Sequence, residues 1–244
     1  MKQNKYDDAN FFAAYENMSR SIHGLEGAGE WHVLQSLIPD LRYKSVLDLG
    51  CGFGWHCRYA REQHADSVIG VDISEKMLEK ARELTNDSSI SYLQMPIEDI
   101  QFADEQFDVV ISSLAFHYIE SFDTICDKVY HSLKPGGVFL FSVEHPIFTS
   151  RNEQDWVYDE QGNILYWAVD GYQDEGKRET AFLTEDVVKY HRTFATYMSN
   201  LIDAGFTIRA VNEPTPSEKM LREIPGMTDE LRRPMFLIIS ATRS

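Results

Sequence analysis

The residues best suited to chemistry lie around a glycine-rich turn near residue 50. Gly50, Gly52 and Gly54 directly follow an apolar run over residues 46–49, and Asp72 closes a second apolar run eighteen residues after Gly54. Glycine takes positive φ values and carries no side chain, so a ligand can lie against the main chain there. An acid at the end of the second strand commonly holds a ribose diol. These residues predict a nucleoside-binding site.

A second group of polar residues follows two later apolar runs. His117 comes shortly after the run 107–111, and Glu144 and His145 come directly after the run 138–143. Strands in the middle of a parallel sheet deliver the residues that follow them to the crevice where ligands bind. Histidine titrates near physiological pH, so His117 is the first candidate for a general base and His145 the second. Glu144 is a candidate substrate contact; the alternative is that alignment of the reactants suffices and no base is used.

The elements that must position these residues alternate between strand and helix. Strands are predicted at 45–49, 68–71, 90–93, 107–111 and 138–143, with helices at 55–64, 75–84 and 122–133 between them. Two consecutive strands, 206–211 and 235–241, end the order after a helix over 194–204. This pattern predicts an α/β fold with a doubly wound, mostly parallel sheet.

We expect one domain with four parts. Residues 1–40 form N-terminal helices, over 8–22 and 29–37; 41–144 form the nucleoside-binding core; 145–192 form a small β-rich cap; and 193–244 complete the sheet. The cap segment interleaves aromatic and acidic residues and breaks the alternating pattern. Long excursions of this kind often lie over a substrate site, although a hairpin packed by its own aromatics would need no substrate.

The spacing of the glycines distinguishes two kinds of nucleotide site. A dinucleotide fingerprint requires G-x-G-x-x-G, and Trp55 stands at its last position here. The segment 48–54 instead reads D-x-G-x-G-x-G, and with V-I-G-V-D-I-S (68–74), F-D-V-V-I-S-S (107–113) and L-K-P-G-G (133–137) it resembles the class I S-adenosylmethionine-dependent methyltransferases. The two consecutive strands at the end match the final hairpin of the same family, so the resemblance implies a Rossmann-like, seven-stranded sheet with an antiparallel final strand.

The resemblance implies S-adenosylmethionine as cofactor and methyl transfer to a small-molecule acceptor by in-line displacement. The cofactor-binding residues that it implies are Tyr15, Arg20, Asp48, Gly50, Gly52, Gly54, Asp72, Ile73, Ile97, Glu98 and Ser112. It further implies that Trp31 helps to close the site and that His191 and Arg192 contact the substrate. Pro96 departs from the family, which usually has an acid there to hold adenine. Either the contact with the adenine amino group is absent and Glu98 and Asp99 form a solvated turn, or that role passes to one of these two acids.

Composition restricts the partners. The chain has 244 residues, with 23 Lys and Arg against 39 Asp and Glu, a formal net charge of −16. This charge argues against nucleic acid or an anionic membrane as partner. The three cysteines show no metal-binding spacing, so no metal is expected, and the polar N-terminus predicts a cytoplasmic protein. The sequence leaves the oligomeric state open.

Two other functions remain open at this point. The chain could bind S-adenosylmethionine or S-adenosylhomocysteine without catalysing transfer. A nucleotide-dependent oxidoreductase is a weaker alternative, because Trp55 and the final pair of strands argue against it.

Overall fold

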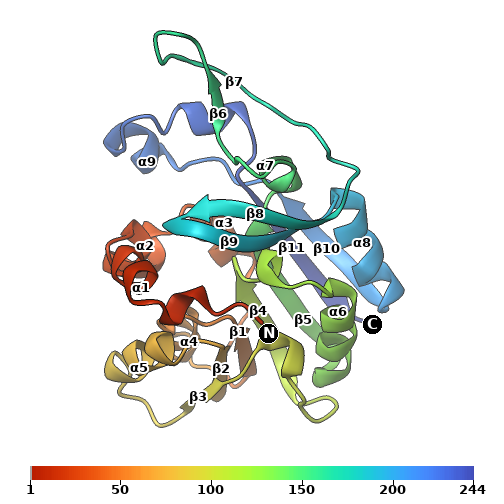
Figure 1. The fold of residues 1–244 in the computed structure, drawn as a ribbon. Helices are drawn as coiled ribbons and strands as arrows, with labels where there is room; N and C mark the ends of the chain where they lie inside the picture. Colours follow the sequence, from red (N-terminus) through yellow and green to blue (C-terminus); the bar gives the residue numbers. More distant parts are fainter. Residues whose placement is uncertain (1) are drawn as a thin grey trace.

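A seven-stranded sheet forms the centre of the molecule in the computed structural model, which describes residues 2–244 (Figure 1). The strands lie in the order β10-β11-β5-β4-β1-β2-β3. Only β11 runs antiparallel to its neighbours β5 and β10. The predicted fold class is therefore confirmed. The seven strands are β1 (Ser45–Leu49), β2 (Ser67–Asp72), β3 (Ile90–Gln94), β4 (Phe107–Ser113), β5 (Leu133–Glu144), β10 (Phe206–Asn212) and β11 (Phe236–Arg243).

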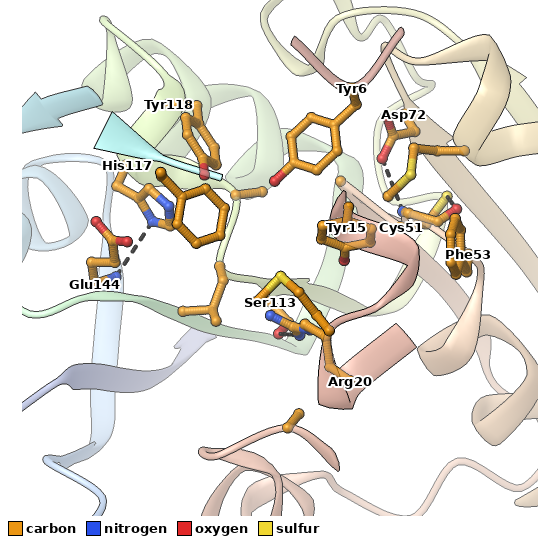
Figure 2. A pocket seen from close by; sticks show the side chains of 18 of the residues that line it. Tyr6, Tyr15, Arg20, Cys51, Phe53, Asp72, Ser113, His117, Tyr118 and Glu144 are labelled. Carbon is orange, nitrogen blue, oxygen red and sulfur yellow. Dashed lines mark hydrogen bonds between the residues drawn. The ribbon is translucent and has the colours of Figure 1, made fainter. Parts of the chain in front are cut away.

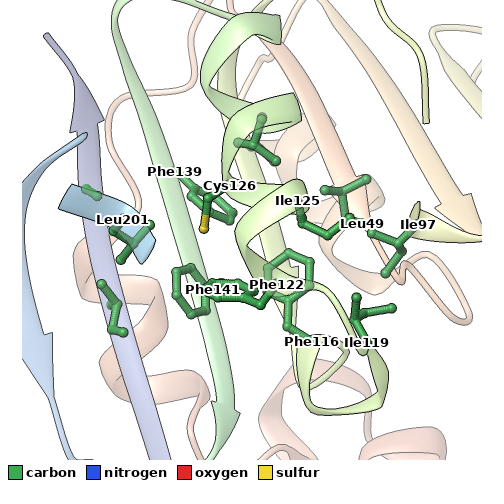
Figure 3. Close-up of a cluster of buried hydrophobic side chains, with 14 of the residues drawn as sticks. Leu49, Ile97, Phe116, Ile119, Phe122, Ile125, Cys126, Phe139, Phe141 and Leu201 are labelled. Atoms are coloured by element: carbon green, nitrogen blue, oxygen red, sulfur yellow. The ribbon is translucent and has the colours of Figure 1, made fainter. Parts of the chain in front are cut away.

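Helices cover both faces of the sheet because alternate strand residues point to opposite sides. On one face, Phe139 and Phe141 of β5 pack against α6 (Phe122–Ser132) and α8 (Phe194–Asp203) (Figure 3). On the other face, Leu140 packs against α3 (Trp31–Leu37). Helices α4 (Trp55–Glu62) and α5 (Glu75–Glu83) cover β1 and β2 there. Burial on both faces explains why these strands read as continuous apolar runs.

The N-terminal region differs from the sequence prediction. A single helix was expected over residues 8–22, but α1 (Ala9–Glu16) ends at Asn17 and a separate α2 (Ser19–Ile22) follows. The Asn17 side chain donates to the carbonyl of Ala13, and Met18 adopts an extended conformation with ψ of 150°. This break turns the chain so that Tyr15, Met18 and Arg20 all reach one cavity. Short 3-10 turns, η1 (Lys5–Asp7) and η2 (Gly24–Gly27), flank these helices.

The predicted cap consists of two separate hairpins. The hairpin of β8 (Gly176–Phe182) and β9 (Thr184–His191) lies across the carboxyl ends of the central strands (Figure 1). The hairpin of β6 (Trp156–Tyr158) and β7 (Ile164–Trp167) projects away from them and holds Arg233 against its aromatic rings. Only the first hairpin covers the cavity. A short α7 (Pro146–Thr149) precedes both.

The remaining elements link β10 to β11 and complete the loops. The link contains α9 (Glu218–Glu223) and η5 (Asp229–Arg232), and two further 3-10 turns, η3 (Ile97–Asp99) and η4 (Phe116–Tyr118), follow β3 and β4. Over residues 2–244, no helix combines the length and apolar character needed to cross a membrane.

Candidate functional site

A cavity of about 530 Å³ lies at the carboxyl ends of β1, β2, β4 and β5. The turns after these strands form its floor, while η1, α1 and α2 and the β8–β9 hairpin form its roof. Figure 2 shows Asp72, Cys51 and Phe53 on one side, His117 and Glu144 on the other, and Tyr6 between them. The nucleoside end and the candidate acceptor end therefore belong to one continuous cavity.

Asp72 ends β2 at the nucleoside end. Its two carboxylate oxygens accept hydrogen bonds from the main-chain N–H groups of Gly52 and Ser74, each at 2.9 Å. Burial raises the pKa of this carboxyl to about 6, although these hydrogen bonds favour the charged form. Asp72 is thus a fixed acceptor beside the glycine turn, as the sequence predicted.

The glycines of the turn have different structural roles. Gly50 has φ of 77° and faces Ala115, so a Cβ there would lie 2.5 Å from the Cβ of Ala115. Gly54 has φ of 72°, and a Cβ there would lie 2.2 Å from the hydroxyl of Tyr92. Gly50 and Gly52 line the cavity, whereas Gly54 does not. Gly54 is therefore required for packing of the helix start, and its predicted cofactor contact stays a prediction.

A buried polar network closes the side of the cavity formed by the N-terminal helices. Glu30, whose side chain is 2% exposed, accepts from Ser113 at 2.8 Å and faces Arg20 at 3.4 Å. Arg20 also donates to Ser113 at 3.2 Å. The second carboxylate oxygen of Glu30 is buried and has no partner among the described residues. The network thus presents one guanidinium and one unsatisfied carboxylate oxygen to the cavity.

At the other end, His117 lines the cavity beside Glu144. The Glu144 main-chain N–H donates to Nδ1 of His117 at 3.4 Å. Burial lowers the pKa of His117 to about 4, despite the charge of Glu144. The ring is therefore neutral, and because Nδ1 accepts, Nε2 carries the proton. His117 can donate a hydrogen bond into the cavity in this arrangement, and its role as a base stays a prediction.

Glu144 is held by a buried lysine that the sequence interpretation missed. Nζ of Lys189, 1% exposed, lies 2.7 Å from Oε1 of Glu144 and 2.8 Å from Oε1 of Gln154. Burial alone would raise the pKa of Glu144, but His117, Lys189 and the neighbouring Gln154 amide outweigh it, so the pKa is lowered. Glu144 therefore remains a carboxylate near neutral pH.

Three tyrosines form one wall of the cavity, in the part that lies between its two ends. The ring of Tyr6 packs edge-on against Tyr15 at 5.3 Å and against Tyr118 at 6.3 Å between centroids. All three line the cavity, and burial raises their pKa values, so their hydroxyls stay protonated.

The structure brings together most of the predicted site residues and separates others from the cavity. Tyr15, Arg20, Ile73, Ile97, Glu98, His117 and Glu144 line it with Gly50, Gly52 and Asp72. Asp48 does not; it is buried beneath the turn, accepts from the Cys57 thiol at 3.3 Å, and burial raises its pKa to about 7. Ser112 donates to the Leu49 carbonyl at 2.7 Å, and its neighbour Ser113 lines the cavity instead. Trp31 packs against His56 and Tyr59.

Three predicted acceptor-side residues have structural partners outside the cavity. His145 pairs with Glu213 at 2.9 Å and accepts from the N–H of Ile147 at the start of α7. Both ring nitrogens of His191 are occupied, by the Thr149 hydroxyl and the Tyr172 carbonyl, each at 2.9 Å. Arg192 donates to the carbonyls of η4 and its flanking loop. We therefore revise the predicted catalytic role of His145 and the substrate contacts of His191 and Arg192.

Comparison with known proteins identifies the family. Residues 47–141 match the methyltransferase domain family. A structure from Listeria monocytogenes, assigned as an S-adenosylmethionine-dependent methyltransferase, is 53% identical with a TM-score of 0.86, covering 91% of this chain and 99% of that chain. The chain belongs to the S-adenosylmethionine-dependent methyltransferases. The enzyme's cofactor is thus S-adenosylmethionine, and the oxidoreductase alternative is excluded.

Two further relatives of this methyltransferase differ in how much they cover. A Mesorhizobium loti S-adenosylmethionine-dependent methyltransferase is 42% identical, covers 90% of this chain and 100% of that chain, and has a TM-score of 0.85. A malonyl-[acyl-carrier protein] O-methyltransferase of Enterobacter lignolyticus is 38% identical over 109 residues, 45% of this chain and 42% of that protein. The second likeness spans less than half of either chain.

The residues of the methyltransferase cavity fit its cofactor. Asp72 offers a fixed carboxylate to a diol, and Gly52 lines the turn without a side chain. Arg20 and the unpaired oxygen of Glu30 match the carboxylate and ammonium of an amino acid. Over residues 2–244, no cluster of three or more His, Cys, Asp or Glu is placed to hold a metal.

Sequence reasoning missed many of the residues that line the cavity, among them Tyr6, Glu30, Ser113, Tyr118, Gln154 and Lys189. Ser113 and Tyr118 are neighbours of predicted residues, so a one-residue shift would have found them. Lys189 lies on β9 of a hairpin whose place over the cavity depends on tertiary packing. No local pattern distinguishes it from a surface lysine.

Proposed function

We propose that this methyltransferase transfers the methyl group of S-adenosylmethionine to a small-molecule acceptor. One observation carries the proposal: the nucleoside end and the acceptor end share a roofed cavity of about 530 Å³. The β8–β9 hairpin and the tyrosine wall cover the acceptor end, which leaves little room for a folded macromolecule.

The residues divide into two groups in this proposal. Asp72 would hold the ribose, Ile97 and Glu98 would flank the adenine, and Arg20 with Glu30 would hold the amino-acid end. When bound, the cofactor supplies a methyl group activated by its sulfonium, so the protein needs mainly to align the acceptor and exclude water. His117 would donate a hydrogen bond to the acceptor, and Glu144 would accept one.

The malonyl-[acyl-carrier protein] relative suggests a different size of acceptor, because its name describes a carrier-bound substrate. In this chain the acceptor end is covered by residues outside the 47–141 match, including Phe182 and Lys189. We therefore favour a free small molecule over a carrier-bound one.

A radiolabel experiment distinguishes a free small-molecule acceptor from a carrier-bound one. The enzyme is incubated with methyl-labelled S-adenosylmethionine and a bacterial extract split by ultrafiltration into small molecules and macromolecules. We expect label in the small-molecule fraction with the wild type and none above background with Asp72→Asn. Label confined to the macromolecular fraction, or equal label with both proteins, would contradict the proposal.

A further inference from the structure

Lys189 joins two side chains at the acceptor end whose remaining polar atoms have no partner. It donates to Oε1 of Glu144 at 2.7 Å and to Oε1 of Gln154 at 2.8 Å. Oε2 of Glu144 and Nε2 of Gln154 are buried, and neither has a described residue in hydrogen-bond geometry, although the Gln154 amide lies close enough to Glu144 to lower the pKa of its carboxyl. Buried polar atoms are costly to leave unpaired, so these two atoms call for a partner in the cavity that both residues line.

The chemistry of Lys189 fixes which atoms are free. An ammonium can only donate hydrogen bonds, so the amide of Gln154 must turn its oxygen toward Nζ. This leaves the amide N–H groups free as donors, while Glu144 keeps one free carboxylate oxygen as acceptor. The cavity therefore presents a donor and an acceptor side by side, with the Nε2–H of His117 as a second donor nearby.

The backbone at Gln154 supports a functional role for this side chain. Its φ is 47°, in the left-handed region that residues other than glycine seldom adopt. Unfavourable backbone conformations of this kind are concentrated at ligand-binding sites, where the surrounding structure enforces them. Here the conformation accompanies contact of the amide with Lys189.

Charge restricts the ligand further. Lys189 and Glu144 neutralise each other, and the ammonium lies near the rings of Phe182 and Phe148 at 5.1 and 5.9 Å. An anionic group on the ligand would be repelled by the Glu144 carboxylate, and a cationic group would be repelled by the Lys189 ammonium. A neutral group avoids both penalties.

We propose that Glu144, Gln154 and Lys189 recognise an uncharged methyl-acceptor molecule. This molecule carries an O–H or N–H group that donates a hydrogen bond, next to an oxygen that accepts one, and the rest of it is apolar or aromatic. The donor hydrogen bonds to Oε2 of Glu144, and the adjacent oxygen accepts from Nε2 of Gln154. The aromatic rings of Phe148 and Phe182 contact the body. Lys189 is a positioning residue, because it acts by holding the other two. This inference rests on the proposed function, since it names the class of its acceptor.

Four one-ring probes test the class by binding alone. They share an ortho methoxy group: 2-methoxyphenol, 1,2-dimethoxybenzene, 2-methoxybenzoate and 2-methoxybenzylammonium. Their affinities for the enzyme saturated with S-adenosylhomocysteine are measured by ligand-detected NMR at millimolar concentrations. We expect 2-methoxyphenol to bind at least about tenfold more tightly than the other three. Equal binding of all four, preference for a charged probe, or no binding of any would overturn the inference.

The Glu144→Gln variant inverts the polarity of the free atom. Lys189 still attracts the side-chain oxygen, so an amide N–H group replaces Oε2, and Lys189 loses its counter-charge. We expect 2-methoxyphenol to lose about tenfold in affinity and 2-methoxybenzoate to bind more tightly than to the wild type. Gln154→Leu should weaken 2-methoxyphenol without that gain. Glu185→Gln, an exposed position on the same hairpin, is the matched control and should change nothing.

The affinity of S-adenosylhomocysteine separates the two proposals. If it saturates every variant but the probes do not discriminate as described, the acceptor class is wrong and methyl transfer stands. If it does not bind the wild type, the proposed function fails and the acceptor class fails with it. A loss of cofactor binding confined to Glu144→Gln would show that Glu144 holds the cofactor, which also overturns the inference.

Discussion

Asp48 carries a buried carboxyl group whose ionisation affects stability. It is 1% exposed, the Cys57 thiol is its hydrogen-bond partner, and its other oxygen has none among the described residues. Its pKa is about 7 in the folded protein, against about 3.9 in an unfolded chain. The folded protein therefore binds this proton more tightly than the unfolded chain does.

The consequence is a loss of stability as pH rises. The favourable contribution is complete below about pH 4 and is lost as pH rises through 7, by up to about 4 kcal/mol. In Asp48→Asn, we expect the free energy of unfolding to change less between pH 5 and 8 than in the wild type, measured by urea denaturation. If the free energy of unfolding of Asp48→Asn changed with pH as much as that of the wild type, burying the charged Asp48 carboxylate would cost little free energy.

A second prediction at the residue scale concerns His117, whose ring we expect to donate a hydrogen bond rather than to act as a base. Because its pKa is about 4, the ring stays neutral above pH 5 and contributes no limb to the pH profile of kcat/KM between 6 and 8. Asparagine can accept from the Glu144 N–H and donate as well, so His117→Asn should retain more activity than His117→Ala. A profile limb near pH 6.5 that vanishes in both variants would instead make His117 the base.

At the scale of elements, the N-terminal segment 2–7 ties the hairpin to the core. Gln3 exchanges two hydrogen bonds with the main chain of Val188 on β9, at 2.7 and 3.3 Å. Asp7 accepts from the Ser74 hydroxyl at 2.6 Å and the Lys76 N–H at 3.1 Å at the start of α5. Tyr6, between them, lines the cavity. The segment thus connects β9 to α5 across the site.

Removing the Asp7 contacts should loosen this connection. We expect Asp7→Ala to cost about 1 kcal/mol, as the loss of a helix cap does, and to release S-adenosylhomocysteine several-fold faster. Hydrogen exchange of residues 2–16 should rise. Asp40→Ala, which removes an exposed ion pair with Arg42, is the control. Equal dissociation rates in both variants would mean that the segment does not retain the cofactor.

Elements formed by local patterns were predictable, and those set by tertiary contacts were not. The strands β1 to β5 and the capping of α5 by Ser74 and of α8 by Thr193 follow from apolar runs and capping residues. The break at Met18 accompanies a single side-chain contact, from Asn17 to the Ala13 carbonyl, and the hairpin of β8 and β9 takes its place over the cavity through contacts with distant residues. A one-dimensional pattern carries no information about those contacts.

At the scale of the whole molecule, the nucleoside end of the site was predictable from local sequence patterns, whereas the acceptor end was not. The nucleoside end was found from sequence because Gly50, Gly52 and Asp72 lie directly after strands whose order fixes where they meet. The acceptor end depends on β9, which begins forty residues after β5 ends, and on Gln154 in the loop before β6. His145, His191 and Arg192 were reasonable candidates by type, but packing gave each a structural partner.

The central claim is that one cavity binds the cofactor at Asp72 and the acceptor at Glu144. Calorimetric titration of S-adenosylhomocysteine into the wild type, Asp72→Asn and Glu144→Gln tests it most directly. We expect Asp72→Asn to weaken binding about tenfold or more, because the fixed carboxylate is lost, and Glu144→Gln to leave the affinity unchanged. Equal affinities for wild type and Asp72→Asn, or a loss in Glu144→Gln as large as that in Asp72→Asn, would contradict this division of the cavity.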